Sequence, residues 1–462
     1  MNFVFYDTET TGTDTTFDQI LQFAAVLTNE KLDEIDRFET RCRLLPHIIP
    51  APGALLATGI RPETLVDRNL PTHYEAMREV GRKLREWSPS VFIGYNTLAF
   101  DEPLLRQTFF QTLQPVFLTN SNGNQRADVL RLAQVAAALS PNSLVVPLSD
   151  RGKPTLRLDK LAPANGFSHE NAHDALGDVE ATIHIARLIR ERASSIWQSM
   201  MPLADKRVVQ TRLASKSPLS LVEYHMGVPS IYPVVGCGHH PMNPNMQAVL
   251  DLNRDPERIL RMTGDELFSE MAGPNRALRT VFSNRMPALL DIGHASDLPS
   301  AIDLGAETIA RRAAMVSDDK EFAVRVGSAM EQRYPPFEPA QLVEQRLYER
   351  FPNSSDQKRM QDFHLGGWTG RAEIAESFDD DRLRELARRL VFFDAPEALS
   401  ERQRANLSHW LINRRHGREN VEAGRTVKAA LEELDKLSSE RGECEAIAEI
   451  RSWFAGFEKP NR

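Results

Sequence analysis

Two carboxylates separated by one residue end the first apolar stretch of the chain. Asp7 and Glu9 follow the strand-forming run 3–6 and precede Thr-Thr-Gly at 10–12. In a strand, residues i and i+2 point to the same face. Both carboxylates would therefore stand side by side, where a divalent cation can neutralise them. An isolated Asp-x-Glu is a frequent pattern, and an acidic strand end is its simpler explanation, so the interpretation depends on the downstream sequence.

Three more groups lie at the ends of predicted elements. Asp101 follows a short buried strand and opens the next helix, at the edge of the sheet where ligand sites of open α/β proteins gather. His173 precedes another predicted helix, and Asp178 lies one turn inside it. Asp174 occupies the position where a helix N-cap is wanted, which makes Asp178 the better candidate ligand.

These residue types fit one kind of chemistry. Four carboxylates without cysteine are hard oxygen ligands, which suit Mg²⁺ or Mn²⁺ better than zinc. Two such ions about 3.5–4 Å apart can bind the attacking and the leaving oxygen of an in-line displacement at phosphorus. A neutral histidine beside them can accept the proton of the attacking water. The candidate ligands and base are Asp7, Glu9, Asp101, Asp178 and His173.

Each member of this set also has an ordinary explanation. Asp101 alone fits a helix cap, Asp178 a solvated helix position, and His173 a hydrogen-bonded structural residue. Five ordinary explanations in this order, all at strand and helix ends, would be independent coincidences. We therefore interpret the set as functional, although no single member would justify that.

The hydrophobic pattern predicts the elements that position these groups. The first strand and the next two form an antiparallel meander, and strands then alternate with helices, which predicts a mixed sheet flanked by helices. Thr72 and Glu75 form a capping box for a helix that reaches Trp87. The other predicted strands are 20–27, 37–44 and 91–96, and the other helices are 99–112, 128–139, 158–165 and 173–192.

The remaining chain divides into two regions. Residues 202–218 are polar and contain helix breakers, as is typical of a linker. Short strand-like runs then predict a β-rich region to about Pro299, and helical patterns dominate from Glu307. The expected domains are 1–195, 202–345 and 346–462.

Composition excludes several classes of protein. The 462 residues are too many for one compact core, and 41% hydrophobic with 26% charged residues is typical of globular proteins. Only three cysteines occur, which excludes a disulfide framework and favours a reducing cytoplasm. No run has the length of a membrane span, and no signal peptide precedes the first strand. We expect a cytoplasmic protein without membrane contact, and its net charge of −8 still permits a basic groove.

The motifs resemble those of a known family. Asp-x-Glu-Thr at 7–10, Asn-x3-Phe-Asp at 96–101 and His-x4-Asp at 173–178 resemble the three exonuclease motifs of the DEDD superfamily, in the histidine-containing DEDDh branch. Further runs, such as 22–25 and 171–175, resemble the bacterial exonuclease I family. The resemblance is specific in the first 190 residues and fainter in the last third.

That resemblance implies a ribonuclease H-like domain, an SH3-like β-rich domain and a C-terminal helical domain around a groove for single-stranded DNA. It implies two Mg²⁺ ions, with Mn²⁺ as a substitute, and His173 as the general base. The matched metal ligands are Asp7, Glu9, Asp101 and Asp178. The matched substrate contacts are Glu9, Thr10, Arg106 and Arg157.

The implied activity is release of 5′-mononucleotides from the 3′ end of single-stranded DNA, in repair and recombination. The family resemblance also implies recruitment by the acidic C-terminal tail of single-stranded DNA-binding protein. We expect a monomer, since a three-domain clamp can work as one. Arg311, Arg312 and Arg325 are candidates for the pocket that binds this tail. The basic run 414–418 is a candidate contributor to the DNA groove.

Two alternatives and one departure from the family remain. The motifs do not distinguish ribose from deoxyribose, so an RNA-trimming exoribonuclease fits them as well. A non-catalytic nucleic-acid-binding scaffold is the other alternative, although a scaffold would need neither the ligands nor the base. The departure concerns DNA-facing positions that are aromatic in the family, which hold Val116, Leu118 and Asn120 here.

Overall fold

The computed structural model describes most of the chain. His173 and the last residue of the basic run, Arg418, lie outside the described residues. Within the described part, no helix has both the length and the apolar composition needed to cross a membrane. The described residues are 1–168, 174–225, 227–273, 275–294, 304–336, 338–417 and 424–458.

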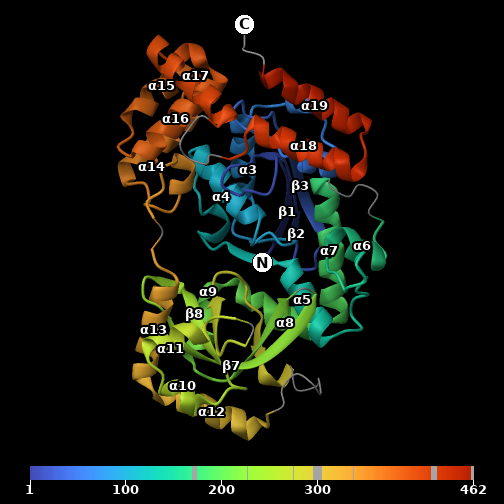
Figure 1. Cartoon of the computed structure of the whole chain (residues 1–462), viewed down its shortest axis with the longest axis vertical. Coiled ribbons are helices and arrows are strands. Elements are labelled where there is room, and N and C mark those ends of the chain that lie inside the picture. The colour runs from blue at the N-terminus through green and yellow to red at the C-terminus, as the bar shows by residue number, and fades with distance from the viewer. Residues whose placement is uncertain are drawn as a thin grey trace.

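The first sheet has five strands in the order β3-β2-β1-β4-β5, with β1 at its centre. Figure 1 labels its first three strands, β1, β2 and β3. β1 (Phe3–Thr10) is antiparallel to β2 (Ile20–Thr28), which is antiparallel to β3 (Glu34–Arg41). On its other side β1 is parallel to β4 (Val91–Gly94), and β4 is parallel to β5 (Gln125–Asp128). The predicted mixed sheet is therefore confirmed, although β3 lies three residues earlier than predicted and β5 was not predicted.

Helices cover both faces of this sheet, because the side chains of β1 alternate between two hydrophobic clusters. Phe3 and Phe5 pack with α5 (Val129–Leu139) and α7 (Ala175–Arg192). The intervening Val4 and Tyr6 pack instead with the helices on the opposite face. Those helices are α3 (His73–Glu86), which has the predicted capping box, and α4 (Asp101–Gln111).

Shorter helices complete the first region and continue into the segment predicted to be a linker. α9 (Lys206–Ala214) occupies that segment, because Val209 and Leu213 bury an apolar edge while the charged residues face outward. The linker prediction for 202–218 is therefore wrong. The other short helices are α1 (Pro52–Thr58), α2 (Pro62–Leu65), α6 (Leu158–Ala164), α8 (Ser194–Met200), η1 (Leu118–Asn120) and η2 (Met201–Ala204).

A second sheet of five antiparallel strands follows, in the order β10-β6-β7-β8-β9. Buried side chains of β7 and β8 form a core with two helices that come later in the chain, α12 and α13. The strands are β6 (Leu219–His225), β7 (Val228–His240), β8 (Asn243–Asp251), β9 (Leu278–Phe282) and β10 (Leu289–Asp291). The helices are α10 (Pro256–Leu260), α11 (Gly264–Glu270), η3 (Ile292–His294), α12 (Ala306–Asp318) and α13 (Lys320–Arg333).

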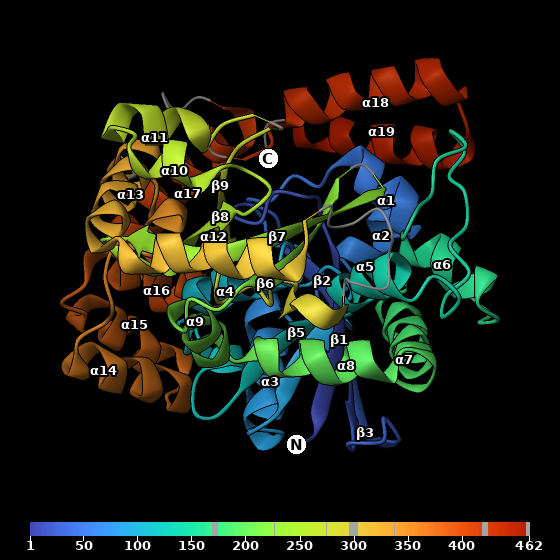
Figure 2. The same cartoon turned by 90° about the horizontal axis from the view of Figure 1, so that it is seen from below.

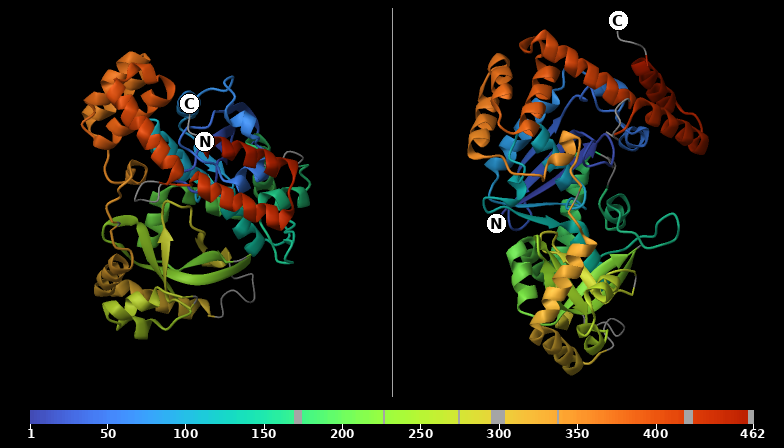
Figure 3. Two further views of the ribbon diagram at one scale, coloured as in Figure 1. Left: turned by 45° about the horizontal axis from the view of Figure 1, so that its top comes forward. Right: turned by 60° about the vertical axis from the view of Figure 1, so that its left-hand side comes forward.

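The last part of the chain is helical, as predicted. Its helices lie across the first sheet from the second sheet, so the first region stands in the middle of the molecule (Figure 3). α18 and α19 lie side by side and pack on α1 (Figure 2). The elements are η4 (Val343–Arg346), α14 (Ser354–Leu365), α15 (Trp368–Ser377), α16 (Asp381–Asp394), η5 (Pro396–Ala398), α17 (Glu401–His416), α18 (Val427–Arg441) and α19 (Glu445–Glu458).

The observed order of mixed sheet, antiparallel sheet and helices confirms the predicted fold class. The domain boundaries near 195–202 and at 345 stay predictions. One hydrophobic cluster is continuous from Phe5 in the first sheet through Trp197 to Leu221 in the second. The two sheets therefore pack around a shared core and hold a fixed relation to each other.

Candidate active site

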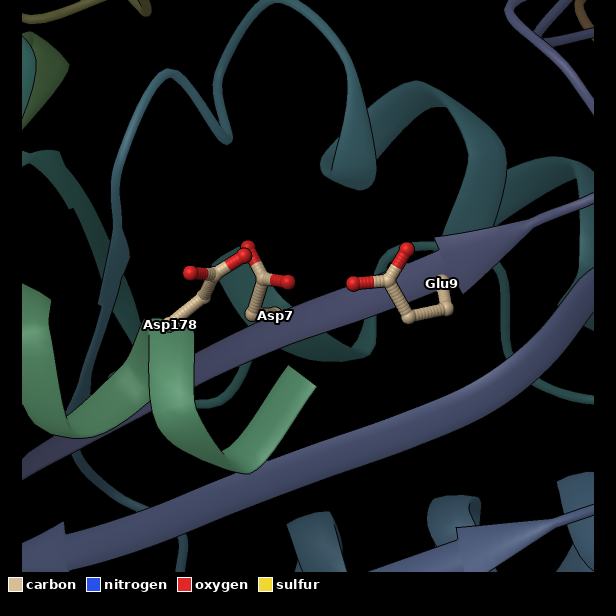
Figure 4. Close-up of side chains that lie close together, drawn as sticks. All are labelled: Asp7, Glu9 and Asp178. Carbon is tan, nitrogen blue, oxygen red and sulfur yellow. The ribbon is translucent and has the colours of Figure 1, made fainter. Parts of the chain in front are cut away.

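Three of the predicted ligands meet at one place. Asp7, Glu9 and Asp178 each offer a carboxylate oxygen, and these oxygens all lie within 4.8 Å of one another. Figure 4 shows Asp7 and Glu9 on the same side of β1, with Asp178 facing Asp7 from the first turn of α7. Residues 171 positions apart in sequence thus share a site that can hold a cation.

Strand alternation explains this meeting. Asp7 and Glu9 continue the face of β1 that begins with Phe3 and Phe5, and that face is covered by α7. The packing of α7 on the sheet therefore places the first turn of this helix beside the two carboxylates. Asp174 is the N-cap residue of α7, as predicted, and its carboxylate also binds Arg41 at 2.6 Å.

The electrostatics of Asp7 and Glu9 are dominated by burial and by the repulsion between neighbouring carboxylates. Burial, and then the charges of Asp101, Asp178 and Glu9, raise the pKa of Asp7 well above its usual value. Burial, followed by Asp178 and Asp101, raises the pKa of Glu9 to about 8. Acids that repel one another in this way are stabilised by a bound cation, and their oxygens are the donors that Mg²⁺ or Mn²⁺ prefers. The residues present therefore fit a divalent-metal site.

Asp101 lies beside this group, next to Thr8 of the same strand. Its Oδ1 accepts a hydrogen bond of 2.5 Å from Thr8, whose side chain points away from those of Asp7 and Glu9. Burial raises the pKa of Asp101 to about 7. Asp101 is close enough to act on the pKa of Asp7, but it is outside the group of carboxylates that lie within 4.8 Å. The structure therefore gathers three of the four predicted ligands tightly and places the fourth at their edge.

The turn after Glu9 is held by internal hydrogen bonds. Thr10, a predicted substrate contact, donates from Oγ1 to the carbonyl of Gly12 at 2.7 Å. Thr11 donates to Asp18 at 2.8 Å. A Cβ at Gly12 would lie 2.4 Å from Asp18 Oδ2, so glycine is needed for this close approach. These contacts fix the C-terminal end of β1, the strand that carries both carboxylates.

Arg106, another residue predicted to contact the substrate, forms an ion pair with a buried carboxylate. Its guanidinium lies 2.8 Å from Glu102 Oε1, which also accepts from Thr119 at 2.6 Å and from Arg126 at 3.0 Å. The guanidinium also lies over the ring of Phe117, 5.0 Å from its centre. Much of the charge of Arg106 is therefore neutralised within the protein, and its contact with a substrate stays a prediction.

Arg157 lies on the wall of a cleft of about 620 Å³ that reaches Asp178. Its side chain is 68% exposed and pairs with Asp159 at 3.0 Å. Arg151 and Lys153 line the same cleft. A basic wall beside a group of carboxylates suits a polyanion whose end reaches the metal site.

Two supporting features were missed in the sequence. Asp128, the last residue of β5, accepts the backbone N–H of Asn96 at 2.9 Å and that of Leu98 at 3.2 Å, which holds the turn before Asp101. Asn96 has a φ of 64°, which asparagine tolerates better than most residues. In the sequence, Asp128 is an acidic residue directly before a helical pattern, and this pattern predicts only the start of a helix.

Comparison with known proteins assigns the chain to a family. A family model described as Exonuclease matches residues 4–186, and a model described as Exonuclease I C-terminal domain matches residues 341–456. The chain belongs to the exonuclease I family. The first match contains the four predicted metal ligands and the predicted base. Between the two matches, residues 187–340 are matched by neither model.

Members of the exonuclease I family align with part of this sequence and with nearly all of its structure. Exodeoxyribonuclease I of Haemophilus influenzae is 31% identical over 279 residues, which are 58% of each chain. The Escherichia coli protein of that name is 30% identical over 301 residues, 62% of this chain and 63% of the relative. These alignments thus span less than two thirds of either relative.

The structures agree over a greater length. Exonuclease I of Methylocaldum szegediense is 25% identical, with a TM-score of 0.85 over 99% of this chain and 100% of that one. Escherichia coli exonuclease I in complex with a dA16 oligonucleotide, 24% identical, has the same fold, with a TM-score of 0.84 and 99% of each chain covered. The fold of the exonuclease I family therefore extends through the region that neither family model matches.

Proposed function

We propose that this chain is a divalent-metal-dependent 3′→5′ exonuclease that hydrolyses single-stranded DNA to 5′-mononucleotides. The observation that carries the proposal is the group of Asp7, Glu9 and Asp178 within 4.8 Å, with Asp101 beside it. The exodeoxyribonuclease I relatives support the reaction, and the Escherichia coli complex with dA16 supports the substrate.

Mg²⁺ is the proposed cofactor, as two ions held by the four carboxylates, with Mn²⁺ as a substitute. When bound, such ions stabilise negative charge on the attacking and leaving oxygens of phosphodiester hydrolysis. The four ligands are Asp7, Glu9, Asp101 and Asp178.

The other proposed roles belong to the protein's own side chains. His173, at the chain position just before α7, would accept the proton of the attacking water on its neutral imidazole. Arg157 and Thr10 would orient the terminal phosphate, with the basic wall of the active-site cleft behind it. Hydrogen bonds within the protein already fix Thr10, so a substrate would meet a preformed turn.

Replacing Asp178 with alanine should abolish mononucleotide release from a 3′-labelled DNA oligonucleotide while leaving strand binding detectable in EDTA. Glu180→Ala is the matched control, because Glu180 lies on the same helix and its ion pair among the described residues is a surface contact with Arg37 at 3.3 Å. Undiminished release by the Asp178 variant would contradict the proposal. A matched RNA oligonucleotide that is degraded faster than the DNA would favour the exoribonuclease alternative.

We also propose recruitment by the acidic C-terminal tail of single-stranded DNA-binding protein. Of the three candidate arginines, Arg312 and Arg325 are engaged, since they donate at 2.6 Å to the carbonyls of Leu252 and Leu260. Arg311 is exposed on α12, so Arg311→Ala should weaken binding of a labelled tail peptide roughly fivefold at low salt. Fluorescence anisotropy that detects no binding by the unmodified chain would refute recruitment.

A monomer in the cytoplasm is the proposed state and location. The thiols Cys42, Cys237 and Cys444 are all free, and the first two are buried. Free buried thiols fit a reducing compartment.

A further inference from the structure

A row of polar side chains crosses three strands of the first sheet beside the metal site. Glu9 of β1 lies directly opposite Gln22 of β2, and Gln22 lies directly opposite Arg41 of β3. Residues paired in this way point to the same face of a sheet, so Gln22 and Arg41 share with Glu9 the face that α7 covers. The row therefore extends from a proposed metal ligand to the outermost strand of the sheet.

Gln22 and Arg41 each bind the same two carboxylates. The buried amide of Gln22 donates to Glu39 Oε1 at 2.9 Å and to Asp174 Oδ2 at 3.1 Å. The guanidinium of Arg41 lies 2.6 Å from the same oxygen of Asp174 and 3.5 Å from that of Glu39. These four side chains form a closed network through which β2 and β3 hold the N-cap residue of α7.

Asp174 uses its two carboxylate oxygens for different parts of the molecule. Its Oδ1 accepts the backbone N–H of Gly177 at 3.5 Å and so caps α7, whereas its Oδ2 accepts hydrogen bonds from the sheet. The connection to the metal site is short, because the backbone N–H of Asp178 donates to the carbonyl of Asp174 at 3.0 Å. A shift of Asp174 away from β3 would therefore move the first turn of α7, and the carboxylate of Asp178 with it.

The exposure and the charge of Arg41 separate this role from two simpler ones. The side chains of Arg41 and Asp174 are 41% and 34% exposed, and ion pairs of this exposure contribute little to overall stability. The charge of Arg41 also reaches Glu9, where it acts against burial and the neighbouring carboxylates, which raise the pKa of Glu9. A positive charge by itself would repel a divalent cation. A favourable effect of Arg41 on metal binding must therefore come from the position that it gives to Asp174.

We propose that Arg41 is a positioning residue of the metal site: through Asp174 it holds the first turn of α7, and with it Asp178, beside the carboxylates of β1. This inference rests on the metal site of the proposed function, and it adds a residue that touches neither the metal nor the substrate. Removing a group that holds a metal ligand in place commonly lowers metal affinity.

Thermal unfolding at increasing Mg²⁺ concentration tests this role without relying on activity. The Mg²⁺ concentration that gives a fixed rise in melting temperature scales with the dissociation constant of the ion. At pH 9, above the pKa of Glu9 of about 8, Arg41→Met should raise that concentration roughly three- to tenfold, because it keeps much of the aliphatic stem but not the ion pair. Arg41→Lys, which can still pair with Asp174, should recover most of the loss.

Arg37→Met is the matched control. Arg37 lies on the same face of β3 and pairs with Glu180 of α7 at 3.3 Å, and this pair is about as exposed as that of Arg41. It joins the strand to the second turn of the helix, whereas Arg41 holds the cap. Arg37→Met should therefore leave the required Mg²⁺ concentration unchanged, and in EDTA the two methionine variants should melt alike. Equal Mg²⁺ requirements of the two variants would overturn the inference.

Kinetics separate positioning from a contact with the strand. At saturating Mg²⁺, Arg41→Met should lower kcat for mononucleotide release and leave KM unchanged, and in EDTA it should bind a DNA oligonucleotide as tightly as the unmodified chain. Weaker binding of the oligonucleotide with an unchanged Mg²⁺ requirement would show that Arg41 contacts the strand, and would overturn its positioning role. An unmodified chain whose melting temperature does not respond to Mg²⁺ overturns the proposed metal site, and the inference with it. One that responds to Mg²⁺ but releases no nucleotide overturns the proposed function alone.

Discussion

Asp7→Asn should reduce DNA cleavage by roughly a hundredfold to ten-thousandfold and at the same time raise the melting temperature of the metal-free protein. The loss in rate follows because a catalytic metal ion supplies several kcal/mol of charge stabilisation in the transition state, and each 1.36 kcal/mol is a factor of ten. The gain in stability follows because the substitution removes one of the carboxylates that repel each other beside β1.

The stability gain should grow with pH. Burial and the neighbouring carboxylates raise the pKa of Asp7 in the folded protein, so the folded state retains a proton that the unfolded chain has already released. This favours folding at low pH, and the advantage is lost as the pH rises through the folded pKa. Asp7→Asn removes that dependence, so its melting temperature in EDTA should exceed that of the unmodified chain more at pH 8 than at pH 5.

Thermal unfolding with and without Mg²⁺ measures this effect. Mg²⁺ should raise the melting temperature of the unmodified chain, more so at pH 8, where fewer protons compete for carboxylates such as Glu9, whose pKa is about 8. It should raise that of Asp7→Asn much less. A metal-free variant that melts below the unmodified chain would show that Asp7 stabilises the fold and is not strained by its neighbours.

Arg382→Met should lower the free energy of unfolding by about 3–5 kcal/mol, because it breaks a buried ion pair. Arg382 is fully buried on α16, and its guanidinium lies 2.7 Å from Asp380. The same group donates to the carbonyls of Arg346 and Arg350 at 2.5 and 2.7 Å. Methionine fills a similar volume but leaves the carboxylate and both carbonyls without this donor.

Another arginine of α16, which forms a surface ion pair with a residue of α15, provides the control. Arg388 pairs with Glu376, and both side chains are more than a third exposed. Arg388→Met should cost no more than about 1 kcal/mol. Denaturant unfolding followed by the fluorescence of Trp368 and Trp410, which lie in the C-terminal region, compares the two variants. Equal losses of stability in both would refute a special role for the buried pair.

The sequence by itself determined the local features of the site. Alternation along β1 puts Asp7 and Glu9 on one face whatever the rest of the chain does. The N-cap at Asp174 and the capping box at Thr72 were also predictable, because a side chain satisfies backbone groups only three residues away. The order of the motifs predicted that Asp178 lies close to these carboxylates. The packing of α7 on β1 is what brings it there.

Only the tertiary structure decided which charged groups pair with one another. Arg106 and Arg414 are ordinary basic residues in the sequence, yet Glu102 and the buried Glu344 neutralise them inside the protein. Arg41 and Asp174 are 133 positions apart and have no local pattern, because the packing of α7 on the first sheet is what brings them together. Charge pairing depends on distance in space, and hydrophobic periodicity carries no information about it.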